Sequence, residues 1–371
     1  MICGIFLLFF GALIAQPVFA REVVTVGYVG GLSGRLSDAA QKSLAALELQ
    51  LKDPEFGRRF AVKIIKYDDE GSMVSAKGLV KRLAMDRPDV IVGGHTSNTI
   101  LSVSKATESL KIPFLVASAT HPEIVRGKQF VVRITFDDEE QGAALSRLAR
   151  RERKLRRAWV VTDIGDEFSK AVSAKYKRDF QKSGGIVFGE SEIISGHVDF
   201  SEIVAGIVSK KQDLDHIFLA INALEAVHLL RELKVRKFNT PVIGTDGLQS
   251  SDLGEGLRVT GSLPFEVTFS AHWIPRSNEA RHKKFISGMR SIGFNVTAFD
   301  ADAACTYDAM ELIKAVMMRG GKPKNAVAWM HALRETKILG ITETRGISSV
   351  GNGERIIPFI SLLPSREASR K

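Results

Sequence analysis

The chain has 371 residues, of which 44% are hydrophobic, 25% charged and 8% aromatic, and its net charge is +10. This composition excludes a disordered or collagen-like chain, and at roughly 100–200 residues per domain the length indicates two domains. The 32 glycines against 11 prolines suit a fold with many tight turns. We therefore expect a two-lobed α/β protein.

Residues 1–20 carry no charged side chain and end in Val18-Phe19-Ala20. This apolar run is too short to span a bilayer comfortably, Pro17 breaks it near its end, and its last residues suit a signal peptidase. Because no Lys or Arg stands at its start, an uncleaved anchor is the alternative. We expect a cleavable signal peptide over 1–20 and a periplasmic protein.

The chain has two cysteines, and Cys3 would leave with the signal peptide. Cys305 would then be the single cysteine of the mature chain, so no internal disulfide can form. Cys3 also lacks the small-residue context that a lipid-attached cysteine needs, so we expect a soluble protein rather than a lipoprotein.

Strand-like and helical patterns alternate in the first half of the chain. Short Val- and Ile-rich runs are typical of buried strands, and the segments between them repeat apolar residues every three or four positions. The expected strands are Val23–Val29, Val62–Tyr67, Val90–Gly93 and Phe114–Ala117, and the expected helices are Ser37–Leu51, Met73–Met85 and Thr99–Leu110. This order predicts a parallel sheet covered on both faces.

The densest basic cluster lies between Arg147 and Arg157, where it follows the helix-like stretch Glu139–Leu148. Positive side chains at this place complement a helix C-terminus. Because no aromatic residues interleave with them, they form no stacking platform, and we expect no nucleic-acid partner. A docking surface for an acidic partner is the alternative.

The same alternation restarts after the basic cluster. The expected elements are strands at Ala158–Thr162, Ile186–Phe188, Ile217–Ile221 and Pro241–Gly244, with helices at Phe168–Gln181, Phe200–Val208 and Leu224–Leu233. Three further helical patterns and two strand-like pieces follow, at Asn278–Arg290, Asp300–Arg319, Val327–Thr336, Gly346–Ser349 and Ile356–Leu362. No flexible linker separates the halves, so we expect several segments to join the lobes.

Catalytic and cofactor motifs are missing from the sequence. Gly31-Leu32-Ser33-Gly34 lacks the last glycine of a nucleophile elbow, and the chain has neither a dinucleotide-binding nor a P-loop motif. The eight histidines show no metal-ligand spacing. The acidic runs Asp68–Glu70 and Asp137–Glu140 stand where helix caps are needed. We expect no enzyme activity, no cofactor and no metal.

Two polar loops follow neighbouring expected strands. The first is Gly93–Asn98, which opens a helix, and the second is Val116–Pro122, which contains Ser118-Ala119-Thr120. In open α/β sheets ligands bind beyond the carboxyl ends of the strands, where helix N-termini present free N–H groups. Together the two loops could clamp a carboxylate, although helix capping explains each loop alone equally well.

The order of these motifs resembles the periplasmic Leu/Ile/Val-binding proteins, the type I solute-binding proteins of ABC importers. The resemblance rests on the leader, Gly31–Gly34, Tyr67-Asp68-Asp69, the two polar loops, Pro241–Gly247 and Thr306–Ala309. It implies two Rossmann-like lobes joined by three crossover segments, with a ligand cleft between them. We expect an N-terminal lobe of residues 21–140 plus 270–340 and a C-terminal lobe of residues 141–269 plus 341–371.

The resemblance also implies a set of ligand contacts. Ser97 and the Ser118-Ala119-Thr120 loop would hold the α-carboxylate of an amino-acid-like ligand, and Asp246 would face its ammonium. Hydroxyls and amides suit an anion and an acid suits a cation, so a zwitterion would bridge the lobes and favour closure.

The sequence departs from the family at the aromatic wall of the pocket. Ile164 and Asn222 stand where the family often has an aromatic side chain, and Phe299 is the aromatic residue that we expect to remain. We therefore expect a wider, more aliphatic pocket.

The function expected from these observations is capture of a small amino-acid-like or carboxylate ligand by a monomer, which delivers it to an ABC permease in the inner membrane. An extracytoplasmic sensor with the same fold is the alternative. An exported enzyme that uses His95, Ser97 or Asp246 is the third hypothesis, and no motif links those residues.

Overall fold

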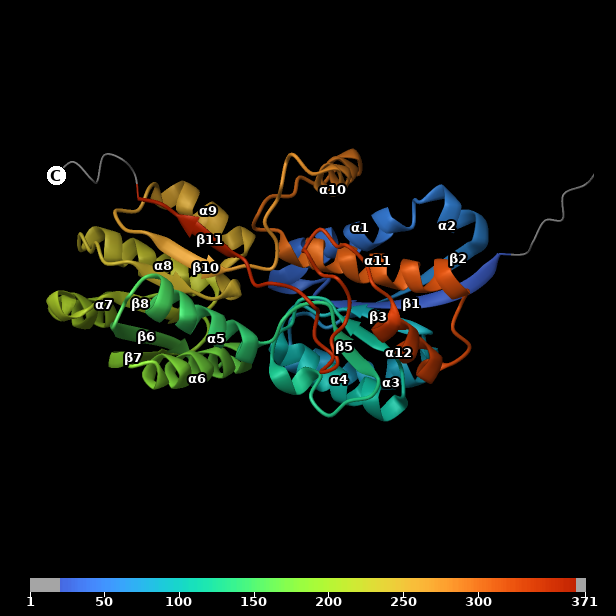
Figure 1. Ribbon diagram of the computed structural model, residues 1–371, viewed down its shortest axis with the longest axis horizontal. Coiled ribbons are helices and arrows are strands. Elements are labelled where there is room, and N and C mark those ends of the chain that lie inside the picture. The colour runs from blue at the N-terminus through green and yellow to red at the C-terminus, as the bar shows by residue number, and fades with distance from the viewer. Residues whose placement is uncertain (1–20, 365–371) are drawn as a thin grey trace, which may run out of the picture.

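The computed structural model describes residues 21–364, and the expected signal peptide lies outside the described residues. Two sheets stand side by side along the long axis of the molecule (Figure 1). The first sheet has the strand order β2-β1-β3-β4-β5 and is parallel throughout. Its strands are β1 (Glu22–Gly30), β2 (Phe60–Asp68), β3 (Val90–Gly93), β4 (Phe114–Val116) and β5 (Val131–Arg133).

The second sheet has the order β11-β10-β9-β8-β6-β7. Its strands are β6 (Arg157–Asp163), β7 (Ile186–Ile193), β8 (His216–Ala220), β9 (Val242–Gly244), β10 (Val267–Ser270) and β11 (Phe359–Leu362). All neighbours are parallel except β11, which runs antiparallel to β10 at the sheet edge. We call the units built on these sheets the first lobe and the second lobe.

Helices cover both faces of each sheet, as parallel strands require. The helices of the first lobe are α1 (Ser37–Gln50), α2 (Pro54–Arg59), α3 (Met73–Asp86), α4 (Ser97–Leu110), α10 (Ala280–Ser291), α11 (Ala301–Gly320) and α12 (Ala326–Glu335). The helices of the second lobe are α5 (Asp138–Arg147), α6 (Glu167–Lys182), α7 (Ser201–Ser209), α8 (Ala223–Val235) and α9 (Ser251–Thr260). Buried side chains of α11 and α12 share one apolar core with β1, and those of α3 and α4 form the core on the other face of that sheet.

The chain crosses between the lobes three times. It leaves β5 for α5 at residues 134–137, returns from β10 to α10 at 271–279, and passes from α12 to β11 through 336–358. The expected architecture is therefore confirmed: two Rossmann-like α/β lobes are joined by three crossover segments. Among residues 21–364, no helix combines the length and the hydropathy that a membrane span needs.

The third crossover contains no strand at Gly346–Ser349, so that prediction was wrong. The segment makes a single bridge between Ile347 and Gly353. Its polar groups bond to the first crossover instead: Gly353 N donates to Thr135 O at 2.8 Å, and Thr344 Oγ1 donates to Ile134 O at 3.0 Å. These bonds satisfy backbone groups that a strand ladder would otherwise use.

Much of the basic cluster is bound within the second lobe. Arg153 pairs with Glu266 at 2.7 Å, and Arg157 pairs with Asp213 at 3.3 Å. Arg150 donates to the carbonyl oxygens of Leu155 and Ser183 at 2.8 Å. These contacts fit side chains that finish a helix end and neutralise nearby acids.

Candidate functional site

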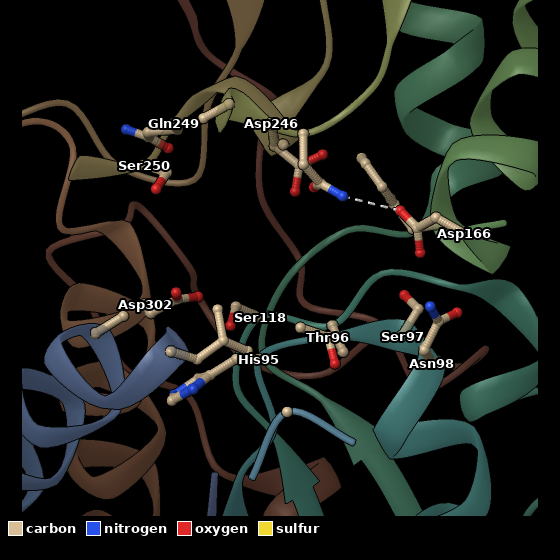
Figure 2. A pocket seen from close by; sticks show the side chains of 18 of the residues that line it. His95, Thr96, Ser97, Asn98, Ser118, Asp166, Asp246, Gln249, Ser250 and Asp302 are labelled. Atoms are coloured by element: carbon tan, nitrogen blue, oxygen red, sulfur yellow. Dashed lines mark hydrogen bonds between the residues drawn. The ribbon is translucent and has the colours of Figure 1, made fainter. Parts of the chain in front are cut away.

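A cavity of about 340 Å³ lies between the two lobes. Figure 2 shows its two walls, with His95, Thr96, Ser97, Asn98 and Ser118 below and Asp166, Asp246, Gln249 and Ser250 above. The lower residues follow β3 and β4, and the upper ones follow β6 and β9. The cavity therefore lies at the carboxyl ends of parallel strands in both sheets, where such folds bind ligands.

Gly93 and Gly94 make the turn that brings the start of α4 to the cavity. Both have positive φ, 122° and 92°, and a Cβ on Gly93 would collide with the carbonyl oxygen of Val29. The Gly94 carbonyl oxygen accepts bonds from Ser118 N, Ser118 Oγ and Ala119 N, each at 3.2 Å. Ser97 Oγ accepts a bond from His121 N at 3.1 Å. These bonds join the two polar loops into one wall.

The N-terminus of α4 faces this wall without a side-chain cap. Thr96 is the N-cap residue, but its hydroxyl bonds to Thr99 Oγ1 at 3.0 Å and to no amide of the first turn. Backbone N–H groups at the start of a helix attract anions, and here hydroxyls surround them. The lower wall is therefore suited to a carboxylate.

The carboxylate of Asp246 lies in the opposite wall, where it contacts His272. Its Oδ2 lies 2.7 Å from His272 Nε2, and its Oδ1 is buried with no hydrogen-bond partner among the described residues. Because a carboxylate only accepts, the shared proton belongs to Nε2, and Nδ1 lies within hydrogen-bond distance of Thr135 Oγ1, at 2.8 Å. The imidazole also stacks on Phe136 with 4.6 Å between ring centroids. Asp246 is thus held in one orientation with one oxygen free for a ligand.

Asp166 and Asn222 form a second polar group on the upper wall. Asp166 Oδ2 accepts from Ser169 Oγ at 2.9 Å and from Asn222 Nδ2 at 3.1 Å, the bond drawn in Figure 2. Burial raises the pKa of Asp166, and these two hydrogen bonds oppose that rise. Phe168, one residue into α6, adds an aromatic ring to the same wall.

Asp138 lies fully buried behind the lower loops, and its backbone N donates to Thr120 O at 3.1 Å. Neither of its carboxylate oxygens has a hydrogen-bond partner among the described residues. Burial, and then the nearby charge of Asp246, hold the pKa of Asp138 well above its usual range. The neutral, protonated form of Asp138 is therefore favoured beside the site.

Six of the residues expected at the site lie together in the cavity wall: Ser97, Ser118, Ala119, Thr120, Asn222 and Asp246. Ile164 and Phe299 lie outside it. The backbone N of Ile164 bonds to Ile193 O at 2.9 Å, and its side chain is 40% exposed. Phe299 packs against Gly254 and lines a separate cavity of about 30 Å³.

The predicted site did not include five further residues that line the cavity: Asp166, Phe168, Gln249, His272 and Asp302. Asp166 stands directly before a predicted helix, so its position at a strand end was a usable signal. His272 and Gln249 gave none, because their partners are distant in sequence: Gln249 Oε1 accepts from His272 N at 2.6 Å. Most of the residues that line the cavity are polar, whereas a more aliphatic pocket was expected.

Glu279, His282 and Glu343 form a cluster outside the cavity that has the composition of a metal site. However, His282 Nδ1 accepts from Trp273 Nε1 at 3.2 Å, which leaves the ring proton on the Nε2 that faces the carboxylates. Arg281 binds both glutamates, at 2.7 and 2.6 Å. The carboxylates therefore already have a cation, and the imidazole offers them a proton rather than a lone pair.

Comparisons with known proteins agree with this architecture. The leucine-binding protein LivK of Thermotoga maritima superposes with a TM-score of 0.78 at 20% identity, over 92% of this chain and 96% of that one. LivJ of Streptococcus pneumoniae in complex with isoleucine gives 0.79 at 16% identity, over 92% and 96%. A solute-binding protein of an ABC transporter from R. palustris in complex with benzoate gives 0.78 at 20% identity, over 93% and 94%.

No curated protein sequence matches the chain. A sequence profile described as "Periplasmic binding protein" matches residues 23–353, which is most of the chain and covers the first two crossovers, most of the third, and every strand except β11. The chain belongs to the periplasmic binding protein family.

Proposed function

We propose that this protein is a periplasmic solute-binding protein of an ABC importer. It captures a small amino-acid-like ligand between its lobes, closes around it, and delivers it as a monomer to a permease in the inner membrane. The ligands bound in two similar structures, isoleucine and benzoate, are both carboxylates and support this class of ligand. Export through the signal peptide expected at residues 1–20 is part of the proposal.

One observation carries the proposal: the cavity offers anion and cation partners on opposite lobes. The start of α4, with Ser97 and the Ser118-Ala119-Thr120 loop, suits a carboxylate, and the free oxygen of Asp246 suits an ammonium. A zwitterion that contacts both groups binds the closed state better than the open one. That difference in affinity is what drives closure.

Binding rather than catalysis fits the partners of the polar groups. In the described part of the chain, Ser97 Oγ bonds to a backbone amide, Asp246 to His272, and His95 to the Tyr28 hydroxyl at 3.4 Å. A serine nucleophile needs a base within hydrogen-bond reach. His95 and Asp246 are engaged with other groups.

The test is a thermal-shift screen of the purified protein against amino acids, amides, short carboxylates and aromatic acids. A ligand present at about 100 times its Kd should add about 2.7 kcal/mol to the free energy of unfolding. We expect amino acids to raise the melting temperature, and Asp246→Asn to weaken that effect for aminated ligands only. Stabilisation by acids without an amine alone would remove Asp246 from its role, and no stabilisation by any compound would refute the proposal.

A further inference from the structure

The wall of the cavity carries a charge opposite to that of the whole protein. The chain has a net charge of +10, yet the cavity is lined by five carboxylates and one guanidinium. The acids are Glu70, Asp166, Asp246, Asp252 and Asp302, and the guanidinium belongs to Arg35, an exposed residue. Walls of one sign raise the local concentration of ligands of the other sign.

These acids differ in the hydrogen bonds and ion pairs that their carboxylates make with other residues of the protein. Asp166 is held by Ser169 and Asn222, and Glu70 accepts a bond from Ser75 Oγ at 2.8 Å. Asp246 has only one oxygen bound, and its side chain is 9% exposed. The Asp302 side chain makes no hydrogen bond or ion pair with any described residue. The Asp252 side chain also has no such partner among the described residues, but Asp252 is exposed. Within the cavity, the carboxylates that the protein leaves unpaired are therefore Asp302 and one oxygen of Asp246.

Asp302 reaches the cavity from the first turn of α11. Figure 2 shows its carboxylate directed into the open space between His95 and the loop that carries Gln249 and Ser250. It lies at the opposite end of the cavity from Ser97 and Asn98. Burial raises the pKa of the Tyr28 hydroxyl most, and the negative charge of Asp302 is the second cause of that rise.

The space beside Asp302 is suited to a hydrocarbon chain with a polar end. Leu36 and Ala39 line the cavity on the first lobe, and Ala301 precedes Asp302 at the start of α11. Methylene groups can pack on these side chains while a terminal charge reaches the carboxylate.

We propose that the ligand carries a second positive charge, bound by Asp302, and is a basic α-amino acid. The carboxylate would bind at Ser97 and the Ser118-Ala119-Thr120 loop, the α-ammonium at Asp246, and the cationic end of the side chain at Asp302. This inference rests on the proposed function and narrows its ligand class. It follows from an electrostatic rule: a carboxylate in a closed cleft is costly until a cation pairs with it.

The experiment is isothermal titration of the purified protein with L-lysine and L-norleucine. Norleucine has the same unbranched four-carbon side chain but no terminal ammonium. A hydrogen-bonded charge contributes about 1.5–3 kcal/mol, so we expect lysine to bind at least about tenfold more tightly. L-Leucine and benzoate complete the panel.

Asp302→Asn supplies the matched variant, with Asp38→Asn as its control. Asp38 lies on α1 outside the cavity, and its side chain is 65% exposed. Asp302→Asn should raise the Kd of lysine at least about tenfold and that of norleucine less than about twofold. Asp38→Asn should change neither value.

The outcomes separate this inference from the proposed function. If norleucine or leucine binds as tightly as lysine, or if Asp302→Asn weakens lysine and norleucine equally, the basic-ligand inference is overturned and amino-acid binding stands. If the folded protein binds benzoate but no amino acid, the basic-ligand inference is overturned and Asp246 loses its role; if it binds neither amino acids nor benzoate, both proposals are overturned. The comparison of lysine with norleucine on the unaltered protein decides the matter even if Asp302→Asn does not fold.

Discussion

Replacing His272 should weaken ligand binding through its effect on Asp246. The two side chains meet at 2.7 Å, and Thr135 and Phe136 hold the imidazole from its other side and its face. In His272→Leu the carboxylate loses its single side-chain donor and its fixed orientation. The ammonium of the ligand then meets an acid that must be reordered on binding.

The size of the effect follows from this geometry. A hydrogen bond to a charged group is worth about 1.5–3 kcal/mol, and Asp246 regains part of it when its carboxylate rotates. A net loss of about 1–2 kcal/mol corresponds to a Kd that is roughly 5- to 30-fold higher. Because His272 is 4% exposed, its own contact with a ligand adds little.

Isothermal titration with the amino acid that the thermal-shift screen ranks highest measures this effect. His272→Gln is the rescue variant, because its side-chain amide can donate from near the position of Nε2, and it should recover most of the affinity. Asp246→Asn removes the charge itself. The double variant His272→Leu/Asp246→Asn should bind the ligand only slightly more weakly than Asp246→Asn alone, because the charged partner of His272 is already absent.

Two results would refute this reasoning. One is a His272→Gln variant that binds as weakly as His272→Leu. The other is a double variant whose loss of affinity is the product of the two single losses, which would mean that the two residues act independently. Melting temperatures of the ligand-free variants show whether each one is folded.

Three further predictions concern groups away from the ligand. Burial strongly raises the pKa of the Cys305 thiol, so it should not react with a thiol reagent in the native protein and should react once denatured, as absorbance of the released chromophore will show. Burial raises the pKa of Asp308 to about 6, against hydrogen bonds from Thr342 and Ile341. The folded state thus holds the Asp308 proton more tightly than the unfolded state does. The contribution of protonated Asp308 to the free energy of unfolding is therefore complete below about pH 4 and is lost as the pH rises through about 6. Urea unfolding between pH 4.5 and 7.5 should show a loss of up to about 3 kcal/mol that Asp308→Asn removes; an equal loss in the variant would contradict the assignment. Zinc should leave the melting temperature unchanged, because Arg281 and the His282 proton occupy the Glu279–Glu343 cluster; a stabilising shift that His282→Ala abolishes would prove that reasoning wrong.

The sequence predicted the fold well, because its signals are local. The expected strand Val90–Gly93 and the expected helix Ser37–Leu51 match β3 and α1 almost to the residue. Long, periodic or Val-rich segments of this kind decide their own structure. The strands β5 and β10 were missed because they are short, with three and four residues.

The site was only partly predictable, because some of its residues are brought together by contacts between segments that are far apart in the sequence. Ser97 and Ser118 follow strand ends, and the parallel topology alone places them together. The role of Asp302 could not be read in the same way, since it depends on how α11 returns to the first lobe after the second is complete. Phe299 was chosen for its aromatic ring, but the cavity is reached instead by Asp302, three positions further along.

The groups around Asp246 link the ligand site to the crossovers. Asp246 bonds to His272 in the second crossover, His272 bonds to Thr135 in the first, and the first is bonded to Thr344 of the third through Ile134 O. Closure of the lobes requires these three segments to change their backbone angles together. A ligand that binds Asp246 therefore contacts a group whose position is set by the crossovers. If that ligand binds one arrangement of the crossovers more tightly than another, it shifts the protein toward the arrangement it prefers. This linkage joins residues 135, 246, 272 and 344, so only the folded chain reveals it.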